Sequence, residues 1–213
     1  MPKIKNPALK AFTAQTGDEL VLAQVLIQRR GAAYELRHVE DRSATTESLR
    51  LVKLAEARAL AQFTATGEFR PLKSAPTLQR GWRMTAADDT ELDAVLSRLY
   101  PGAVADWHAA QTASPPVTHY REYVNRQSGM YRITAMLTDA QAAQVARTVC
   151  DAKSCLKRRL WTVPGLAPDA AAAKSLIPCL EPCAVLMESA RKAMRAGQEE
   201  KLPIKLASEG KAD

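Results

Sequence analysis

The chain has 213 residues, 46% of them hydrophobic and 25% charged, which is an ordinary composition for a soluble globular protein of one domain or two small ones. A core can form in such a chain without metal or disulfide staples. The sequence MPKIKNPALK contains no signal peptide and no apolar run approaches a membrane span, so we expect a cytoplasmic protein with reduced thiols.

The first half of the chain predicts a hairpin followed by helices. Residues 1–16 are expected to form a basic, loosely held lead-in with at most one helical turn. Two β-like runs, 19–29 and 33–40, flank Gly31 and predict the hairpin. Apolar residues at helical spacing predict a helix over 50–65.

The middle of the chain continues with a short strand and a second helix. A loop that begins at residue 69 leads into a strand at Trp82–Met84. Asp88 or Asp89 can cap a helix over 90–100, because aspartate accepts hydrogen bonds from the free backbone N–H groups of a first turn. Residues 112–118 contain two adjacent prolines between polar residues and are interpreted as a linker.

The second half predicts mostly helices around one strand. We expect a helix at 119–127, a strand at 130–137 and a helix that Thr138 caps and that runs to about residue 149. Residues 164–174 are expected to be an exposed spacer, and 183–196 the last helix.

The predicted fold class is therefore α+β, with two domains and a tail. Residues 1–115 form an N-terminal domain of a hairpin and helices, and residues 116–198 form a helix-rich domain that contains every cysteine of the chain. Residues 199–213 are polar and are expected to be a mobile tail.

The four cysteines fall into two close pairs, in the pattern C-x4-C, 23 residues, C-x3-C, at Cys150, Cys155, Cys179 and Cys183. In a reducing compartment, clustered cysteines indicate a metal or redox site before they indicate disulfides. Four thiolates suit zinc or an iron–sulfur cluster. The pattern therefore predicts one metal centre held by all four residues.

Local features favour a [4Fe–4S] cluster, with zinc as the alternative. Neither pair has the tight spacing of a zinc knuckle, and a cubane needs its thiolates at four separate corners. Pro178 and Pro182 stiffen the backbone directly before Cys179 and Cys183, and the helix that follows presents its positive end to an anionic centre. Basic residues surround the pattern, and they either stabilise an anionic cluster or are simply solvated: Arg147, Lys153, Lys157, Arg158, Arg159 and Lys174.

Five segments resemble a known family. They are RPLKSAPTLQRGWR, LYPGAVADW, NRQSGMYRI, CDAKSCLKRRLW and SLIPCLEPCAVLMESARKA. Together they resemble the four-cysteine 4Fe–4S-binding domain, with its N-terminal stabilising domain, that is attached to sirohydrochlorin cobaltochelatase-like proteins. The resemblance implies the same four cysteines as cluster ligands and an association with tetrapyrrole metabolism.

This chain departs from the longer members of that family. Only about 18 residues precede the predicted hairpin, so we expect no chelatase domain there. Its three histidines, His38, His108 and His119, are scattered and form no motif. We therefore assign no chelation and no catalytic residue, and we expect an electron-transfer or structural redox module more readily than an enzyme.

Basic residues in the middle of the chain predict a second, anion-binding site. Arg70, Lys73, Arg80 and Arg83 can grip a carboxylate or phosphate through forked donors, or pair with surface acids instead. The expected partners are an unknown redox or tetrapyrrole-pathway protein and an anionic small molecule. Despite the net charge of +7, nucleic acid and membrane are not expected, although a zinc-stabilised basic module that binds nucleic acid or a protein is the alternative function.

Overall fold

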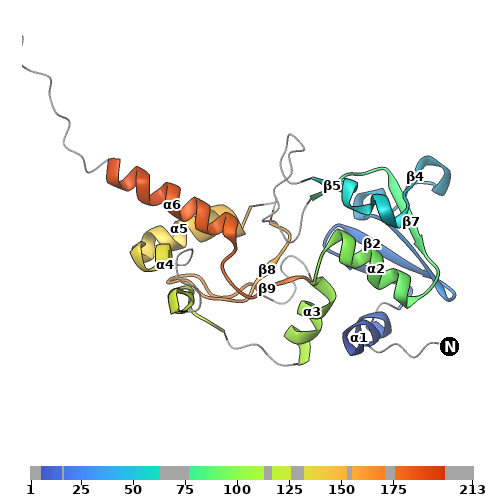
Figure 1. Ribbon diagram of the computed structural model, residues 1–213, viewed down its shortest axis with the longest axis horizontal. Helices are drawn as coiled ribbons and strands as arrows, with labels where there is room; N and C mark the ends of the chain where they lie inside the picture. The colour runs from blue at the N-terminus through green and yellow to red at the C-terminus, as the bar shows by residue number, and fades with distance from the viewer. Residues whose placement is uncertain are drawn as a thin grey trace, which may run out of the picture.

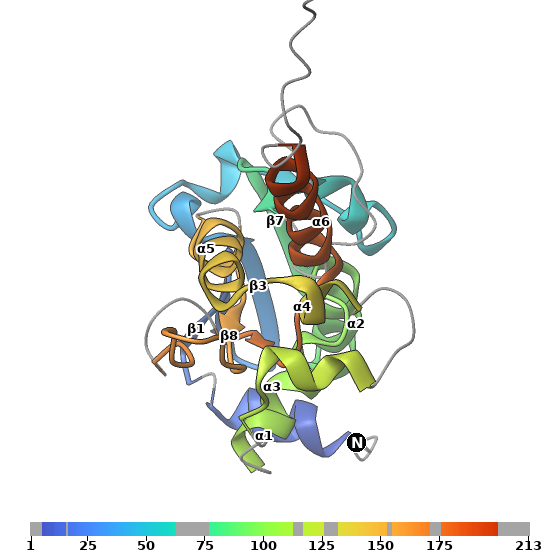
Figure 2. The same cartoon turned by 90° about the vertical axis from the view of Figure 1, so that its left-hand side faces the viewer.

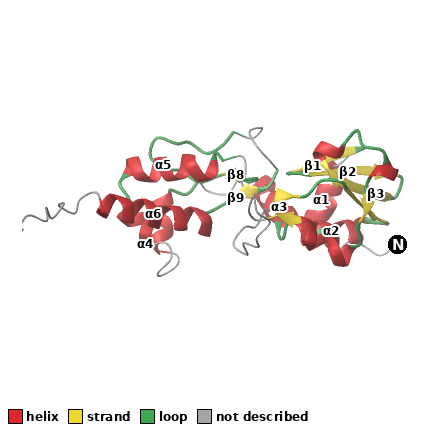
Figure 3. Ribbon diagram, turned by 90° about the horizontal axis from the view of Figure 1, so that it is seen from above, coloured by secondary structure: helices red, strands yellow, loops and turns green. Residues whose placement is uncertain are grey.

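The computed structural model describes residues 6–15, 17–62, 77–112, 117–125, 132–152, 155–170 and 176–199. Helices and strands are mixed, which confirms the α+β class. Two groups of elements lie side by side, and the short strands β8 (Arg158–Arg159) and β9 (Pro178–Cys179) lie between them (Figure 3). The expected tail, 199–213, lies outside the described residues apart from its first residue.

A five-stranded sheet, in the order β1-β2-β3-β7-β4, forms the first group together with three α-helices and three 3₁₀ helices (Figure 1). Its pairs are antiparallel except β4 with β7. The elements of this group are α1 (Pro7–Gln15), β1 (Glu19–Leu22), β2 (Val25–Arg30), β3 (Ala33–His38), the 3₁₀ helices η1 (Val39–Asp41) and η2 (Thr46–Ser48), β4 (Arg50–Leu51), η3 (Leu54–Leu60), β5 (Ala61–Gln62), β6 (Thr77–Leu78), β7 (Trp82–Ala86), α2 (Asp89–Leu99) and α3 (Ala103–Thr112).

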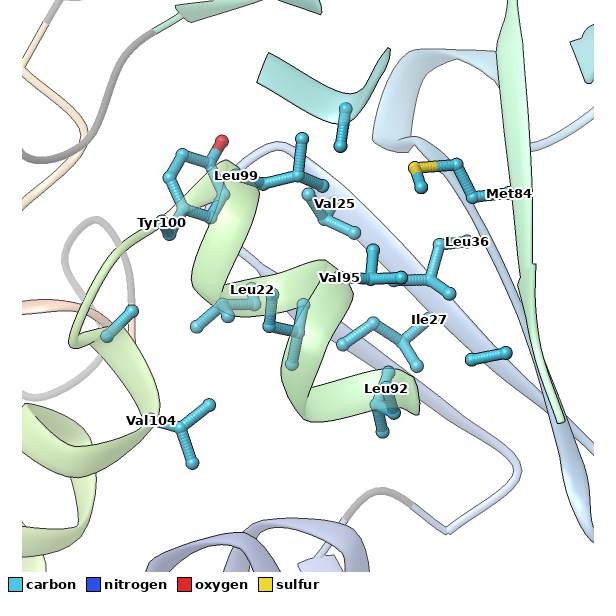
Figure 4. Packing of buried hydrophobic residues seen from close by; sticks show 14 of the residues in the cluster. Leu22, Val25, Ile27, Leu36, Met84, Leu92, Val95, Leu99, Tyr100 and Val104 are labelled. Carbon is cyan, nitrogen blue, oxygen red and sulfur yellow. The ribbon is translucent and has the colours of Figure 1, made fainter. Parts of the chain in front are cut away.

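The first hydrophobic core lies between this sheet and α2 (Figure 4). Leu92 and Val95 of α2 lie by Ile27 and Leu36 of the sheet, and all four side chains are buried. Asp88 caps α2 as predicted, because its side chain accepts from the backbone N–H groups of residues 90 and 91. The strand predicted at Trp82 is confirmed as β7.

The predicted hairpin exists, but the first of its two predicted strands, 19–29, is divided into two strands. Gly31 takes a positive φ of 66° in the turn between β2 and β3, as a tight hairpin requires. A second turn at Ala23, with φ of 53°, divides 19–29 into β1 and β2. Tertiary contacts hold that turn: the Gln24 backbone N–H donates to the Tyr100 hydroxyl, and its side chain accepts from the Leu78 N–H. No turn-forming residue types mark Ala23 in the sequence.

The described part of 50–65, residues 50–62, is not the predicted helix. The Arg50 and Val52 N–H groups donate to carbonyls of residues 81 and 83, which draws 50–52 into the sheet. Only Leu54–Leu60 coils, as the 3₁₀ helix η3.

Two helices of this group were not predicted from the sequence. The lead-in forms α1, whose Phe12 is fully buried and packs edge-on against Trp107 of α3, with ring centroids 5.4 Å apart. Packing between α1 and α3 thus orders both segments, and α3 extends into the first residue of the predicted linker.

The second group is helical (Figure 2). Where a helix was predicted at 119–127, the described residues form the 3₁₀ helix η4. The strand predicted at 130–137 is wrong. The described part of that segment is a short helix that packs against η4 and the last helix. The helix that Thr138 caps is confirmed, as is the last helix. The helices of this group are η4 (Tyr120–Asn125), α4 (Arg132–Met136), α5 (Asp139–Cys150) and α6 (Ala184–Glu199).

Candidate metal centre

Two of the cysteines lie at neighbouring ends of the helices α5 and α6. The two helices pack against each other, and a Cβ on Gly197 near the end of α6 would lie 3.5 Å from the Gln141 side chain near the start of α5. The helices are therefore antiparallel. Cys150, the last residue of α5, and Cys183, directly before α6, consequently lie at the same end of the helix pair, beside β8 and β9 (Figure 3).

The other two cysteines come from the loop and strand at that end. Cys179 lies in β9, which pairs in parallel with β8 so that it stands opposite Arg159. The Leu160 N–H donates to the Cys179 carbonyl over 2.9 Å and secures this register. Cys155 follows α5, and its backbone N–H donates to the Ala152 carbonyl over 2.9 Å.

All four cysteines are outside disulfide bonds, and they differ in exposure. Cys150 and Cys179 are buried, at 5% and 7% exposure, whereas Cys155 and Cys183 are half-buried. Cys150, Cys179 and Cys183 also belong to the second hydrophobic core, with Trp161 and the inner face of α5 and α6. The group therefore has one side inside the protein and one side toward solvent.

Burial and mutual repulsion keep the inner thiols protonated. Burial raises the pKa of Cys150 far above its usual range, and negative charge on Cys155, Cys179 and Cys183 raises it further. Burial likewise raises the pKa of Cys179 to about 11, although the Trp161 indole and the charge of Lys157 lower it. All four sulfur atoms thus act on one another electrostatically, and binding of a metal centre must displace protons from them.

The donor set, four thiols, suits a polynuclear iron–sulfur centre. Within the described part of the chain, no three His, Cys, Asp or Glu side chains gather closely enough to chelate a single metal ion. A zinc ion holds each sulfur at about 2.3 Å from one point, so its four ligands must converge tightly. A cubane takes each thiolate on a different iron and therefore accepts a wider set. Four thiols without other ligand types match this donor requirement.

The basic residues near the cysteines have different environments. Arg159 is buried, its guanidinium lowers the pKa of Cys150, and it donates to the Trp161 and Ala167 carbonyls at 2.6 Å each. Lys157 is half-buried and acts on Cys179, while Arg147 is exposed. Lys153 and Lys174 lie outside the described residues.

Asp169 completes this arrangement and was missed in the sequence. Its carboxylate accepts from the Arg159 backbone N–H at 2.7 Å and lies 3.4 Å from the guanidinium. It sits in the predicted spacer, which is thus fastened to β8 along its described residues. In the sequence, the one feature that could have indicated this ion pair is an acidic residue placed after the basic run at 157–159.

The predicted anion-binding residues are not shown as one group. Arg70 and Lys73 lie outside the described residues. Arg80 is exposed and forms an ion pair with Glu40, and Arg83 lies across from Arg37 in the β3–β7 register. An anion site made by all four therefore stays a prediction.

Comparisons with known proteins point to the same centre. Residues 112–192 match the model of a 4Fe-4S iron-sulfur cluster binding domain, and residues 7–111 match that of the DR2241 stabilising domain. Comparison with curated proteins gave no match. No helix among the described residues is long and apolar enough to cross a membrane.

Among solved structures, the chain is similar to DR2241 from Deinococcus radiodurans. The two are 28% identical with a TM-score of 0.72, over 88% of this chain and 41% of that one. The chain thus spans less than half the length of that protein. DR2241 is described as a multi-domain protein with structural similarity to chelatases and with two additional novel domains.

Proposed function

Because the chain belongs to the family that joins a DR2241 stabilising domain to a 4Fe-4S iron-sulfur cluster binding domain, we propose that it binds one [4Fe–4S] cluster through Cys150, Cys155, Cys179 and Cys183. What supports this assignment is that Cys150, Cys179 and Cys183 share one hydrophobic core and that charge on Cys155 acts on Cys150. The comparisons give zinc, the alternative considered from the sequence, no support.

We propose further that the chain is a one-electron redox module. Cys150 and Cys179 would hold the cluster from the inside, and the half-buried Cys155 and Cys183 would hold its solvent-facing side. When bound, the cluster supplies one-electron chemistry. The chain's residues exclude water on the inner side through Trp161 and the α5–α6 core, and they leave the outer side open to a partner.

Positive charge beside the sulfurs supports the redox assignment. Reduction adds negative charge to an anionic centre, so Lys157 and Arg159 favour the reduced state. Asp169 balances part of the Arg159 charge, which leaves Lys157 as the less compensated cation. The partner we propose is a redox protein or a protein of tetrapyrrole metabolism, and only the chelatase-like description of DR2241 supports the second.

Metal and sulfide analysis of anaerobically purified protein tests this function. The parent should be brown, contain iron and sulfide in equal amounts, and accept one electron reversibly in a redox titration. Each of Cys150→Ser, Cys155→Ser, Cys179→Ser and Cys183→Ser should lower iron and sulfide together.

A matched control separates ligand loss from general disturbance. Thr148→Ser changes an exposed residue two positions before Cys150 and should leave the iron content at the parent's level. A colourless parent that contains zinc, or a Cys150→Ser protein with unchanged iron and sulfide, would overturn the four-thiolate cluster. An iron–sulfur protein that accepts no electron would leave the cluster standing and remove its redox role.

A further inference from the structure

The indole of Trp161 carries a buried N–H group that lacks an ordinary partner. Trp161 is 1% exposed, and its Nε1 makes no hydrogen bond of normal geometry in the described structure. Buried polar atoms are almost always paired, so an orphan donor needs a physical reason. An indole N–H can only donate, so it cannot be satisfied by changing its role.

The orphan N–H lies beside the sulfur of Cys179. β8 and β9 hold Arg159 opposite Cys179, so that Trp161, two residues further on, lies next to the same strand. Trp161 and Cys179 share the second hydrophobic core. The indole lowers the pKa of the Cys179 thiol, as a donor directed at the sulfur does, although the contact falls short of a complete hydrogen bond.

The sulfur of Cys179 has one hydrogen bond of its own, to a backbone carbonyl. In the thiol form, Sγ donates its proton to the Glu181 carbonyl at 3.2 Å. A metal ligand must be a thiolate, which has no proton to donate and can only accept. As a cluster ligand, the Cys179 sulfur is therefore an acceptor on the side where the Trp161 N–H lies.

Arg159 fixes the ring in place for this role. Its guanidinium carbon lies 5.4 Å from the centroid of the Trp161 ring, in a cation–π contact, and its Nη1 donates to the Trp161 carbonyl. The ring is thus held on both its face and its backbone, so little reorganisation is needed when the donor finds its acceptor.

We propose that Trp161 is a positioning residue that donates its indole N–H to the Cys179 thiolate of the bound cluster and thereby favours the reduced state. The inference rests on the proposed cluster ligation. A donor to a cluster sulfur stabilises the more negative, reduced form more than the oxidised form.

Trp161→Phe tests the donor, because it keeps an aromatic ring and removes the N–H. The variant should bind as much iron and sulfide as the parent. At a fixed potential set by dithionite and mediator dyes, the ratio of reduced to oxidised cluster should fall about fivefold, which is the size expected for one hydrogen bond and corresponds to about 40 mV. Trp107→Phe is the matched control, since Nε1 of Trp107 is also buried without a partner but lies in the first core. It should leave the ratio unchanged.

Isotope labelling of the parent gives a second readout that needs no variant. The chain has three tryptophans, and Trp82 donates its Nε1–H to the Gln79 carbonyl at 2.7 Å, away from the cysteines. With all indoles ¹⁵N-labelled and the cluster reduced, pulsed electron paramagnetic resonance should show hyperfine coupling to a single indole nitrogen. That coupling should persist in Trp107→Phe.

The outcomes are distinct for the donor and for the cluster. A loaded Trp161→Phe protein with the parent's ratio, or a parent without indole coupling, would overturn the role of Trp161 and leave the cluster in place. Should Trp161→Phe fail to fold, the labelled parent decides alone. Absence of iron and sulfide from the parent would contradict the proposed function itself.

Discussion

Ile177 and Cys179 are separated by a single residue, yet they are buried in different hydrophobic cores. Ile177 is 1% exposed within the first core, between the sheet and its helices. Cys179 is 7% exposed within the second core, beside Trp161. Leu156 and Leu176 also pack against the first core, so the segments that carry two of the cysteines are anchored in the N-terminal group.

Ile177→Ala should therefore weaken both the first core and the metal centre. Removing a fully buried isoleucine side chain leaves a cavity and should lower the free energy of unfolding by about 2–4 kcal/mol. Cys179 should also lose part of its positioning, so iron content should fall. Urea unfolding followed by circular dichroism, together with iron analysis, measures both effects.

Leu180→Ala is the control for this change. Leu180 is 37% exposed, so its truncation should alter the free energy of unfolding by no more than about 0.5 kcal/mol. Equal losses of stability in the two variants would show that the burial of Ile177 does not connect the groups.

Removal of the cluster should loosen the second group more than the first. The cluster would join the end of α5 to the start of α6 across a long connection, and without it only packing holds these ends. Amide hydrogen exchange on loaded and metal-free protein should show lost protection at 150–160 and 177–187. The strands β2, β3 and β7, within their own core, should keep theirs. Uniform loss along the chain would contradict this separation.

Asp169→Asn should destabilise the segment between β8 and the second cysteine pair. The side chains of Arg159 and Asp169 are only 5% and 12% exposed, so removing the carboxylate leaves a buried cation without its counter-charge. The guanidinium keeps two carbonyl acceptors, so we expect a loss of about 3 kcal/mol, at the lower end for a broken buried pair. Thermal or urea unfolding checks the value.

A surface ion pair of the same composition provides the comparison for Asp169. Asp139 pairs with Arg121 but its side chain is 62% exposed. Asp139→Asn should cost at most about 1 kcal/mol, because solvent screens exposed pairs. A cost for Asp169→Asn as small as that for Asp139→Asn would mean that the buried charge is stabilised by the carbonyls alone.

His38 should make the stability of the first group dependent on pH. It is 2% exposed, and its Nδ1 accepts from the Glu40 N–H at 3.1 Å, which requires a neutral imidazole. Burial lowers the pKa of His38 below the ordinary value of 6.5, although the charges of Asp41 and Glu40 raise it. When folding lowers the pKa of a group, the group stabilises the protein fully at a pH above its pKa in the unfolded chain. This stabilisation is lost as the pH falls through its pKa in the folded protein. Urea unfolding should therefore show declining stability below about pH 6.5.

The variant that tests this is His38→Asn. Its side-chain oxygen can accept from the Glu40 N–H in place of Nδ1, so its stability at pH 8 should be close to that of the parent. Between pH 6.5 and 5 the variant should lose less stability than the parent does. The same decline in both proteins would assign the pH dependence to other groups.

The sequence by itself determined the elements whose signals are local. Asp88 and Thr138 cap their helices because their side chains reach free N–H groups two or three residues away. The turn at Gly31 needs a positive φ that glycine adopts without strain. The two cysteine pairs pointed to a metal centre, since four soft thiol ligands in two close pairs favour one.

Only the tertiary structure decided the features that depend on distant partners. Ala23 takes a positive φ because Tyr100 and Leu78 hold its neighbour Gln24, and neither is close in sequence. Helix α1 forms because Phe12 finds Trp107, and Arg50 and Val52 join the sheet rather than a helix because β7 offers carbonyls. The inner and outer sides of the cysteine group, and the place of the Trp161 indole near Cys179, follow from the second core, which joins residues of α5 and α6 to Trp161 and Cys179. Long-range packing of this kind leaves no periodic pattern in the chain, because the contacting residues are chosen by shape and burial and not by spacing.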